Sequence, residues 1–234
     1  MSRKSKRNQS SPDGRAPQAS PAHRAWIAYA AVAALVLAVV AGSLLYQREK
    51  SPAGPGAEQA ALASTQSPTL GDAAAKVHIV EFIDPACETC ALFFPLVKQV
   101  LAENPGQIRL SIRHVAFHNG SDYVVRLLEA SRKQDKYWQT LEALLASQAQ
   151  WTANHAVQPE RVGLAIAGVG LDVEQLMTDM DSPDVAARIR QDANDAVTLK
   201  VTATPEYFVN GRPLPSFGEQ QLLTLIGEEL QSAY

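Results

Sequence analysis

The stretch that decides the fold runs from Lys76 to Cys90 and reads KVHIVEFIDPACETC. Its first eight residues form a near-continuous apolar run of β-branched and aromatic side chains, which predicts a strand buried on both faces of a sheet. Glu81 is the exception within this run. Residues 87–103 then place apolar side chains at helical spacing, which predicts a helix with the acid Glu88 in its first turn and a kink at Pro95.

A second strand is predicted at residues 107–115, where apolar residues alternate. The order strand, helix, strand predicts a βαβ unit with parallel strands. Strand character returns at residues 206–209, the Asn210-Gly211 pair predicts a hairpin turn, and residues 218–232 predict an amphipathic helix. The chain is therefore expected to form an α/β fold, a central mixed sheet flanked by helices. Between the two strand regions, helices are predicted near 121–133, 135–149, 158–167, 172–180 and 183–198.

The residues before this domain differ in composition from the rest. Residues 1–24 carry six Lys or Arg against one acid, which predicts a basic disordered tail. Residues 25–46 are 22 positions without a charge, enough for a helix to span the roughly 30 Å hydrocarbon core with the basic tail in the cytoplasm. A cleaved signal peptide ending near Val39-Val40-Ala41 is the alternative, although its apolar region is typically only about 7 to 15 residues long. Residues 47–69 predict a flexible tether, and residues 70–234 one folded domain.

The charge balance argues against nucleic-acid binding. The whole chain carries a net charge of −3, and six basic residues and one acid give the tail +5, which leaves −8 on the remainder. No run of Lys or Arg in that remainder could neutralise phosphates. We therefore expect no nucleic-acid partner.

The two cysteines of the chain, Cys87 and Cys90, lie three positions apart at the junction of the predicted strand and helix. A helix N-terminus presents unpaired N–H groups and a positive dipole end. These stabilise a thiolate, so the pKa of Cys87 is expected to fall from about 8.5 into a range of roughly 3.5 to 7.5. We predict that Cys87 is the nucleophile and that Cys90, one turn later and more buried, resolves the mixed disulfide.

Two other uses of the cysteine pair were weighed. A structural disulfide across two intervening residues would constrain almost nothing. A zinc site needs about four protein ligands, or three and a water, and the chain has no second Cys-x-x-Cys. The sequence therefore predicts no metal and no organic cofactor. The candidate histidines, which show no ligand spacing, are His78, His114, His118 and His155.

Over about residues 70–234 the chain resembles the DsbA-like branch of the thioredoxin superfamily, bacterial extracytoplasmic disulfide oxidoreductases. The resemblance implies a thioredoxin fold with a helical domain inserted at about 120–200. The residues that carry it are Leu70-Gly71-Asp72, the run from Val80 to Cys90, Pro95, the run from Gln134 to Trp138 and the run from Val201 to Gly211.

The resemblance also implies roles for residues outside the cysteine motif. Thr204-Pro205 would be a cis peptide bond against the active site, with the Thr204 backbone pairing with an extended substrate; without the family, this proline reads simply as a strand start. Glu81 would be a buried acid that relays a proton to or from Cys90, and the alternative is a glutamate that reaches water. Asp84 and Pro85 are expected to shape the loop.

Between the cysteines, oxidant members of this family carry Pro-His where this chain has Glu88-Thr89. A nearby carboxylate disfavours a thiolate on Cys87, although an acid in the first helical turn interacts favourably with the dipole. We predict that Glu88 and Thr89 tune the redox couple and make the protein a weaker oxidant than the Pro-His members.

Together these features predict a single-pass protein of the inner membrane whose catalytic domain, periplasmic or extracellular, exchanges disulfides with exported polypeptides. A redox partner at the membrane, a quinone-linked oxidase or a thiol reductase, is needed for turnover. The direction of redox flow stays open, and the short tether favours a monomeric catalytic domain. The alternatives are a thioredoxin-fold metallochaperone and a peptide-binding module.

Overall fold

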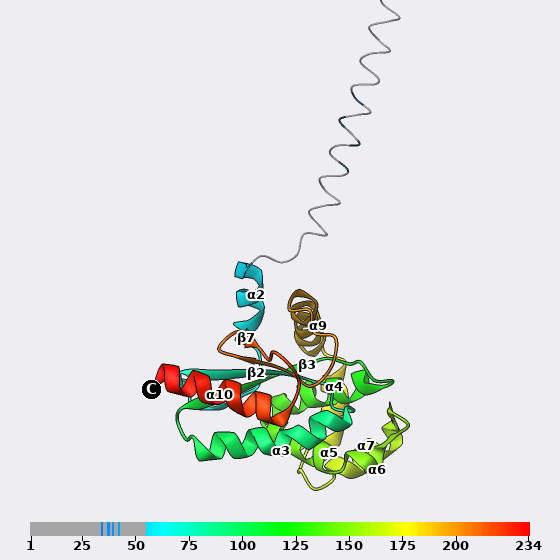
Figure 1. The fold of residues 1–234 in the computed structure, drawn as a ribbon. Helices are drawn as coiled ribbons and strands as arrows, with labels where there is room; N and C mark the ends of the chain where they lie inside the picture. Colours follow the sequence, from blue (N-terminus) through cyan, green and yellow to red (C-terminus); the bar gives the residue numbers. More distant parts are fainter. Residues whose placement is uncertain (1–33, 35–36, 38, 40–41, 43–54) are drawn as a thin grey trace, which may run out of the picture. The chain divides into compact units, whose positions relative to one another are not determined.

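A five-stranded mixed sheet with the order β1-β3-β2-β6-β7 forms the centre of the domain (Figure 1). The computed structural model describes residues 34, 37, 39, 42 and 55–234, and contacts group residues 53–234 into one unit. The central strand β2 pairs parallel with β3 and antiparallel with β6, which confirms the predicted βαβ unit and mixed sheet. The strands are β1 (Thr69–Gly71), β2 (Val77–Ile83), β3 (Ile108–His114), β6 (Glu206–Val209) and β7 (Arg212–Pro213).

The helices begin and end close to their predicted bounds. Asp172 caps α8, its side chain accepting a hydrogen bond from the backbone N–H of Gln175 at 3.0 Å. The helix predicted at 135–149 is divided at Ser147, and the cysteine helix continues through Pro95. The helices are α3 (Glu88–Glu103), α4 (Ser121–Ser131), a 3₁₀ turn (Arg132–Gln134), α5 (Tyr137–Ala146), α6 (Gln148–Trp151), α7 (Pro159–Ile166), α8 (Val173–Met180), α9 (Pro183–Thr198) and α10 (Glu219–Ala233).

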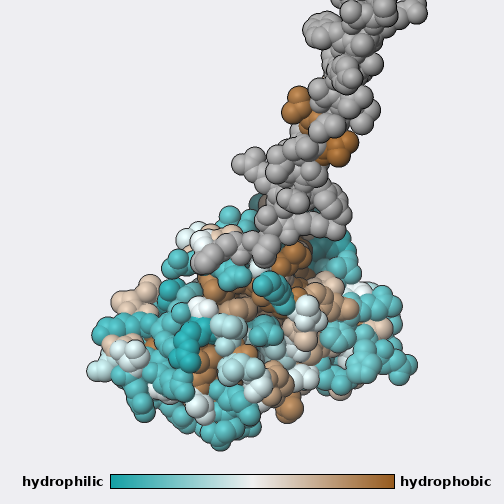
Figure 2. All heavy atoms as spheres, turned by 45° about the horizontal axis from the view of Figure 1, so that its top comes forward, coloured by the Kyte–Doolittle hydropathy of each residue, from teal (hydrophilic) through white to brown (hydrophobic). Residues whose placement is uncertain are grey.

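Alternate side chains of β2 enter different cores because successive residues of a strand point to opposite faces. Val77, Ile79 and Ile83 belong to the main core, together with residues of α3 and α10. Val80 and Phe82 belong to a smaller core on the face of α9 and of helix α2 (Pro55–Leu62). Figure 1 shows these two helix layers on either side of the sheet. Figure 2, turned to bring the α2 side forward, shows hydrophobic side chains near the middle of this face and hydrophilic ones around them.

The predicted tether is wrong from residue 55 onward. Helix α2 (Pro55–Leu62) forms there, starting at a proline, with Glu58 in its first turn and several alanines, which have the highest helix propensity. Ala61 is buried, and Leu62 packs against the smaller core. The chain then enters the sheet at Thr69, within the range expected to be flexible. Residues 47–54 lie outside the described part.

A small hairpin inside the helical block was not predicted. Strands β4 (Thr152–Ala153) and β5 (Ala156–Val157) pair antiparallel, and Asn154 and His155 form the turn with φ of 49° and 59°. Two-residue strands are too short to produce a readable alternation.

The predicted tail, residues 1–24, and most of the predicted membrane span lie outside the described residues. Within the span, residues 34, 37, 39 and 42 are helical. Among the residues that the structure does describe, no helix has the length and apolar character needed to cross a membrane. The anchor stays a prediction.

A buried arginine joins the sheet to both helices of the α2 face. Arg113 on β3 is fully buried, and its Nε lies 2.5 Å from Asp192 Oδ1 while Nη2 pairs with Asp195 on the same helix, α9. Its Nη1 donates to the Ala61 carbonyl in α2 at 2.8 Å. Arg113 is therefore the polar link that holds α2 and α9 on this face.

We predict that Arg113→Leu lowers the free energy of unfolding by about 3–5 kcal/mol, because it leaves two buried carboxylates without their cation. Urea unfolding of the full chain in detergent, followed by tryptophan fluorescence, measures this. Arg212→Leu is the matched control, because Arg212 pairs with Glu228 and Glu229 at an exposed site, where ion pairs contribute little. Equal losses in the two variants would contradict the prediction.

Candidate active site

Cys87 is the N-cap residue of α3, and Cys90 lies one turn into the helix. Both carry free thiols. Cys87 is 6 % exposed and Cys90 is 0 % exposed, so the second cysteine is the more buried one, as predicted. The arrangement places one sulfur at the edge of the surface and the other behind it.

The environment of Cys87 stabilises a thiolate. A hydrogen bond from the Cys90 side chain is the largest cause that lowers its pKa, and the Thr204 side chain and the backbone N–H groups of Cys90 and Thr89 act in the same direction. Partial burial opposes them, and the net effect lowers the pKa of Cys87 from 9.0 to about 5. Two of these donors belong to the first turn of α3, where the sequence predicts that N–H groups stabilise the thiolate.

The environment of Cys90 has the opposite effect. Burial raises the pKa of its thiol far above the ordinary value, and the nearby Cys87 and Glu81 add to the rise. The two thiols are therefore chemically unequal: at neutral pH Cys87 is ionised and Cys90 holds its proton.

The bond between Thr204 and Pro205 is cis, as the family resemblance implies. The Cys87 thiol lies 3.2 Å from the Thr204 carbonyl oxygen and donates to it, and Pro205 is buried. Antiparallel pairing of β2 with β6 explains this meeting of residues 117 positions apart. The end of β2 leads to Cys87, and the start of β6 follows Pro205.

Glu81 is fully buried in the middle of the sheet, on the face of the main core. Its Oε1 accepts a hydrogen bond from the Tyr207 hydroxyl at 3.0 Å, and its Oε2 is buried without a hydrogen-bond partner. Burial raises the pKa of Glu81 to about 8, opposed by the Tyr207 hydrogen bond and reinforced by the charge of Cys87. The alternative of a glutamate that reaches water is therefore excluded for this structure.

Two buried polar side chains fix the loop before the cysteines. Asp84 Oδ1 accepts from the Ala86 N–H at 2.8 Å, and its Oδ2 accepts from backbone and side-chain donors of residues 117–121 in the next loop. Gln148 of α6 donates from Nε2 to the carbonyls of Pro85 and Cys87 at 2.8 and 2.9 Å. The hydrogen bonds of Asp84 agree with its predicted role in shaping the loop, and the role of Pro85 stays a prediction. Gln148 is an addition that no local pattern signalled.

Glu88 and Thr89 are less buried than the loop that Asp84 and Gln148 hold. The Glu88 side chain is 70 % exposed, and its Oε1 lies 3.7 Å from Nδ1 of His155 on the β4–β5 turn. Thr89 is half-buried. The backbone of Thr89 is among the main causes that lower the pKa of Cys87, and the side chain of Glu88 is not. Because water screens the charge of an exposed carboxylate, we expect Glu88 to destabilise the Cys87 thiolate less than its position in the sequence suggests.

The described residues contain no group of three or more His, Cys, Asp or Glu placed to hold a metal ion. The sequence-based expectation of a metal-free and cofactor-free site remains a prediction.

The fold and the cysteine site define a DsbA-like thiol-disulfide oxidoreductase. Residues 63–227 match the family model described as thioredoxin, and the chain belongs to the thioredoxin family.

Particular relatives agree with this class. The chain is 28 % identical over 187 residues to the probable disulfide bond formation protein D of Bacillus anthracis, covering 77 % of this chain and 85 % of that protein. A solved thioredoxin-like oxidoreductase from Silicibacter pomeroyi is 30 % identical, with a TM-score of 0.64, and the match covers 75 % of this chain and 98 % of that one. The chain also matches, at 30 % identity over 66 % of its length, the Na⁺/H⁺ antiporter NhaA of Herminiimonas arsenicoxydans, of which it spans about a quarter, 24 %.

We predict that Glu81→Gln stabilises the reduced chain increasingly as pH rises. The folded-state pKa of about 8 lies above the ordinary 4.5, so the folded protein favours the protonated acid and loses stability as pH climbs between these values. The contribution of Glu81 to the free energy of unfolding falls by at most about 1.4 kcal/mol per pH unit. The variant has no carboxyl group there and lacks this pH dependence. Urea unfolding of both chains at pH 5 and pH 8 measures the difference.

The control for this experiment is Glu228→Gln, which removes the same charge from an exposed side chain. A stability difference between Glu81→Gln and the wild type that stays constant from pH 5 to pH 8 would show that Glu81 is not held protonated.

Proposed function

We propose that this protein is a membrane-anchored extracytoplasmic oxidoreductase that forms disulfide bonds in exported polypeptides through Cys87-Glu88-Thr89-Cys90. The observation that carries the proposal is the inequality of the two thiols. A cysteine whose pKa is about 5 stands at a helix N-terminus, 3.2 Å from the Thr204 carbonyl, with a buried partner of raised pKa behind it.

The reaction begins with the Cys87–Cys90 disulfide. A substrate thiolate attacks the sulfur of Cys87, a new sulfur–sulfur bond forms, and the bond to Cys90 breaks with its electron pair on Cys90. A second substrate thiolate then attacks the substrate's own sulfur in this mixed disulfide and releases Cys87 as a thiolate. Two electrons pass from the substrate dithiol to the cysteine pair, and the substrate leaves with a disulfide.

Glu81 supplies the proton that Cys90 needs when it leaves. The raised pKa of Cys90 makes its thiolate an unfavourable product, and Glu81, with a pKa of about 8, is protonated at neutral pH. Its unpartnered Oε2 is the oxygen free to exchange that proton. Thr204 and Pro205 would hold the substrate, the backbone of Thr204 pairing with an extended peptide beside Cys87.

The oxidising direction follows from the thiolate. A low pKa on Cys87 stabilises the reduced protein, and a stable reduced form makes the disulfide a better oxidant. The name of the Bacillus anthracis relative, a disulfide bond formation protein, supports the same direction. A quinone-linked oxidase at the membrane would restore the disulfide; a thiol reductase would take its place if electrons flowed the other way.

The proposed location rests on residues 25–46, whose uncharged sequence fits a single inner-membrane span, and on the basic tail that would keep residues 1–24 in the cytoplasm. The catalytic domain would then act as a monomer on the periplasmic or extracellular side.

The cysteine variants test the chemistry. We predict that Cys90→Ser accumulates mixed disulfides with a reduced two-cysteine peptide supplied with an oxidant, because Cys87 can form the bond and no second thiol resolves it. Cys87→Ser should form none and should lose exchange activity by at least 100-fold. Non-reducing gels and mass spectrometry of the full chain measure both. Adducts on Cys90 in the Cys87→Ser variant would overturn the assignment of roles.

The reduction potential tests the direction. Thiols with a pKa of about 7 and about 3.5 accompany potentials near −270 and −120 mV in thioredoxin and DsbA, and one pKa unit corresponds to about 30 mV. With the pKa of Cys87 at about 5, we expect a potential between about −210 and −165 mV at pH 7, measured against glutathione buffers. A value at or above about −120 mV would contradict the predicted weaker oxidant, and one below about −270 mV would contradict the oxidising direction.

Glu88→Gln is the matched variant for this measurement. Because the Glu88 carboxylate is exposed, its removal is expected to shift the potential toward the oxidising side by less than about 30 mV, one pKa unit. A larger shift would show that the Glu88 side chain, and not the buried surroundings of the cysteines, sets the reduction potential of the pair.

A further inference from the structure

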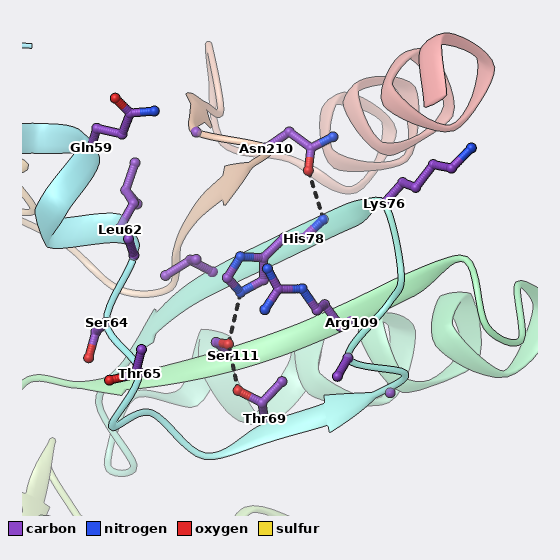
Figure 3. A pocket seen from close by; sticks show the side chains of 15 residues that line it. Gln59, Leu62, Ser64, Thr65, Thr69, Lys76, His78, Arg109, Ser111 and Asn210 are labelled. Carbon is purple, nitrogen blue, oxygen red and sulfur yellow. Dashed lines mark hydrogen bonds between the residues drawn. The ribbon is translucent and has the colours of Figure 1, made fainter. Parts of the chain in front are cut away.

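A second site lies on the opposite face of the sheet from Glu81. His78 and Glu81 point to different faces of β2, since side chains alternate along a strand. On the His78 side, α2 and the segment after it stand over β1, β2 and β3, and a cavity of about 780 Å³ lies between them. Figure 3 shows this pocket with the side chains of His78, Arg109 and Ser111 on its sheet wall. None of the 15 residues that line it is acidic.

Arg109 gives the pocket a cation without a counter-ion. Arg109 is half-buried, its Nε is buried without a hydrogen-bond partner, and no carboxylate of the described residues pairs with its guanidinium. A buried N–H group that lacks an acceptor costs free energy. The guanidinium is a planar fork that fits carboxylate and phosphate oxygens. A carboxylate or a phosphate is therefore a ligand that this side chain fits.

The other positive group near the pocket is engaged elsewhere. The Lys76 ammonium donates to the Ala233 carbonyl at 2.9 Å and lies 4.4 Å from the centre of the Tyr234 ring, and Figure 3 shows its side chain directed away from His78. The pKa of His78 is lowered to about 4 by burial and by Arg109, so His78 is neutral at pH 7. Arg109 and Lys76 are thus the two cations that line the pocket, and Arg109 is the one whose Nε has no hydrogen-bond partner among the described residues.

Hydroxyl and imidazole groups surround the position beside Arg109. His78 Nε2 and Ser111 Oγ lie 2.8 Å apart, and Ser111 Oγ and Thr69 Oγ1 also lie 2.8 Å apart. These groups form a hydrogen-bonded chain across β2, β3 and β1 (Figure 3). Thr69 Oγ1 also donates to the Ser67 carbonyl at 3.2 Å, so a hydroxyl of this chain would leave its present acceptor to donate to an oxygen held by Arg109. Leu62 and Val80 supply apolar surface for the rest of a ligand.

We propose that this pocket binds a small organic anion through a carboxylate or phosphate group held by Arg109 and Ser111. The volume is within the range of sites that take small molecules, about 300 to 1,000 Å³. The proposal does not depend on the redox function, because its residues lie on the other side of the sheet from the cysteines and Glu81.

The test is the thermal unfolding midpoint of the full chain titrated with citrate or with inorganic phosphate, at low millimolar concentrations and ionic strength matched with chloride. Binding to the folded state alone raises the midpoint with a saturating dependence on ligand. A rise with either anion supports the site, and the anion that gives it identifies the preferred group. No rise with either anion overturns the proposal.

Salts that are excluded from the protein surface also stabilise the folded state, but this effect does not saturate and does not depend on one side chain. Variants of the pocket therefore distinguish binding from this general effect. Arg109→Gln should weaken the effect at least 10-fold, while Arg161→Gln, an exposed arginine on α7, should leave it unchanged. Ser111→Ala, which keeps the Arg109 cation, should weaken the effect of the anion about 3-fold. This variant tests the site if Arg109→Gln does not fold. An undiminished response in these pocket variants also overturns the proposal.

Discussion

The antiparallel pairing of β2 with β6 is the constraint on which the site depends. The register sets Glu81 opposite Tyr207, so one pairing positions the buried acid and the hydroxyl that bonds it. The same register brings the turn before β6 beside the loop after β2, where Thr204 meets Cys87. Neither meeting results from local structure, because the partners are more than a hundred residues apart. A shift of one residue would send Glu81 to the other face, since side chains alternate.

Burial and hydrogen bonding act on Glu81, Cys87 and Cys90 with different results. Glu81 is fully buried and receives one donor, the Tyr207 hydroxyl. The desolvated carboxyl of Glu81 is therefore held protonated, with its pKa near 8. Cys87 has helix N–H donors and Cys90 does not share them. The two thiols differ because hydrogen bonds lower the pKa of Cys87, whereas deep burial raises the pKa of Cys90.

The sequence predicts those parts of the fold that local periodicity specifies. The continuous apolar run of β2, the spacing within α3 and the Asn210-Gly211 turn were all readable, and the helices after residue 120 lie near their predicted bounds. Helix α2 was missed because alanine beside proline and glycine reads as a linker, and its burial depends on Arg113 far along the chain. Tyr207 and Gln148 were missed for a related reason: a buried hydrogen bond needs a partner that only tertiary structure supplies. The cis bond at Pro205 and the role of Glu81 were accessible through the family resemblance alone.

The helical block between β3 and β6 helps to position the cysteine site through hydrogen bonds. Gln148 of α6 holds the carbonyls on either side of Ala86, and Ser121 of α4 donates to Asp84. These contacts fix the backbone that presents the first N–H groups of α3 to Cys87. The residues between the cysteines are more exposed than this frame, and water screens the charge of an exposed carboxylate. We therefore expect the redox properties of the pair to depend more on the Cys90 hydrogen bond and the N–H groups of the first turn of α3 than on the charge of Glu88.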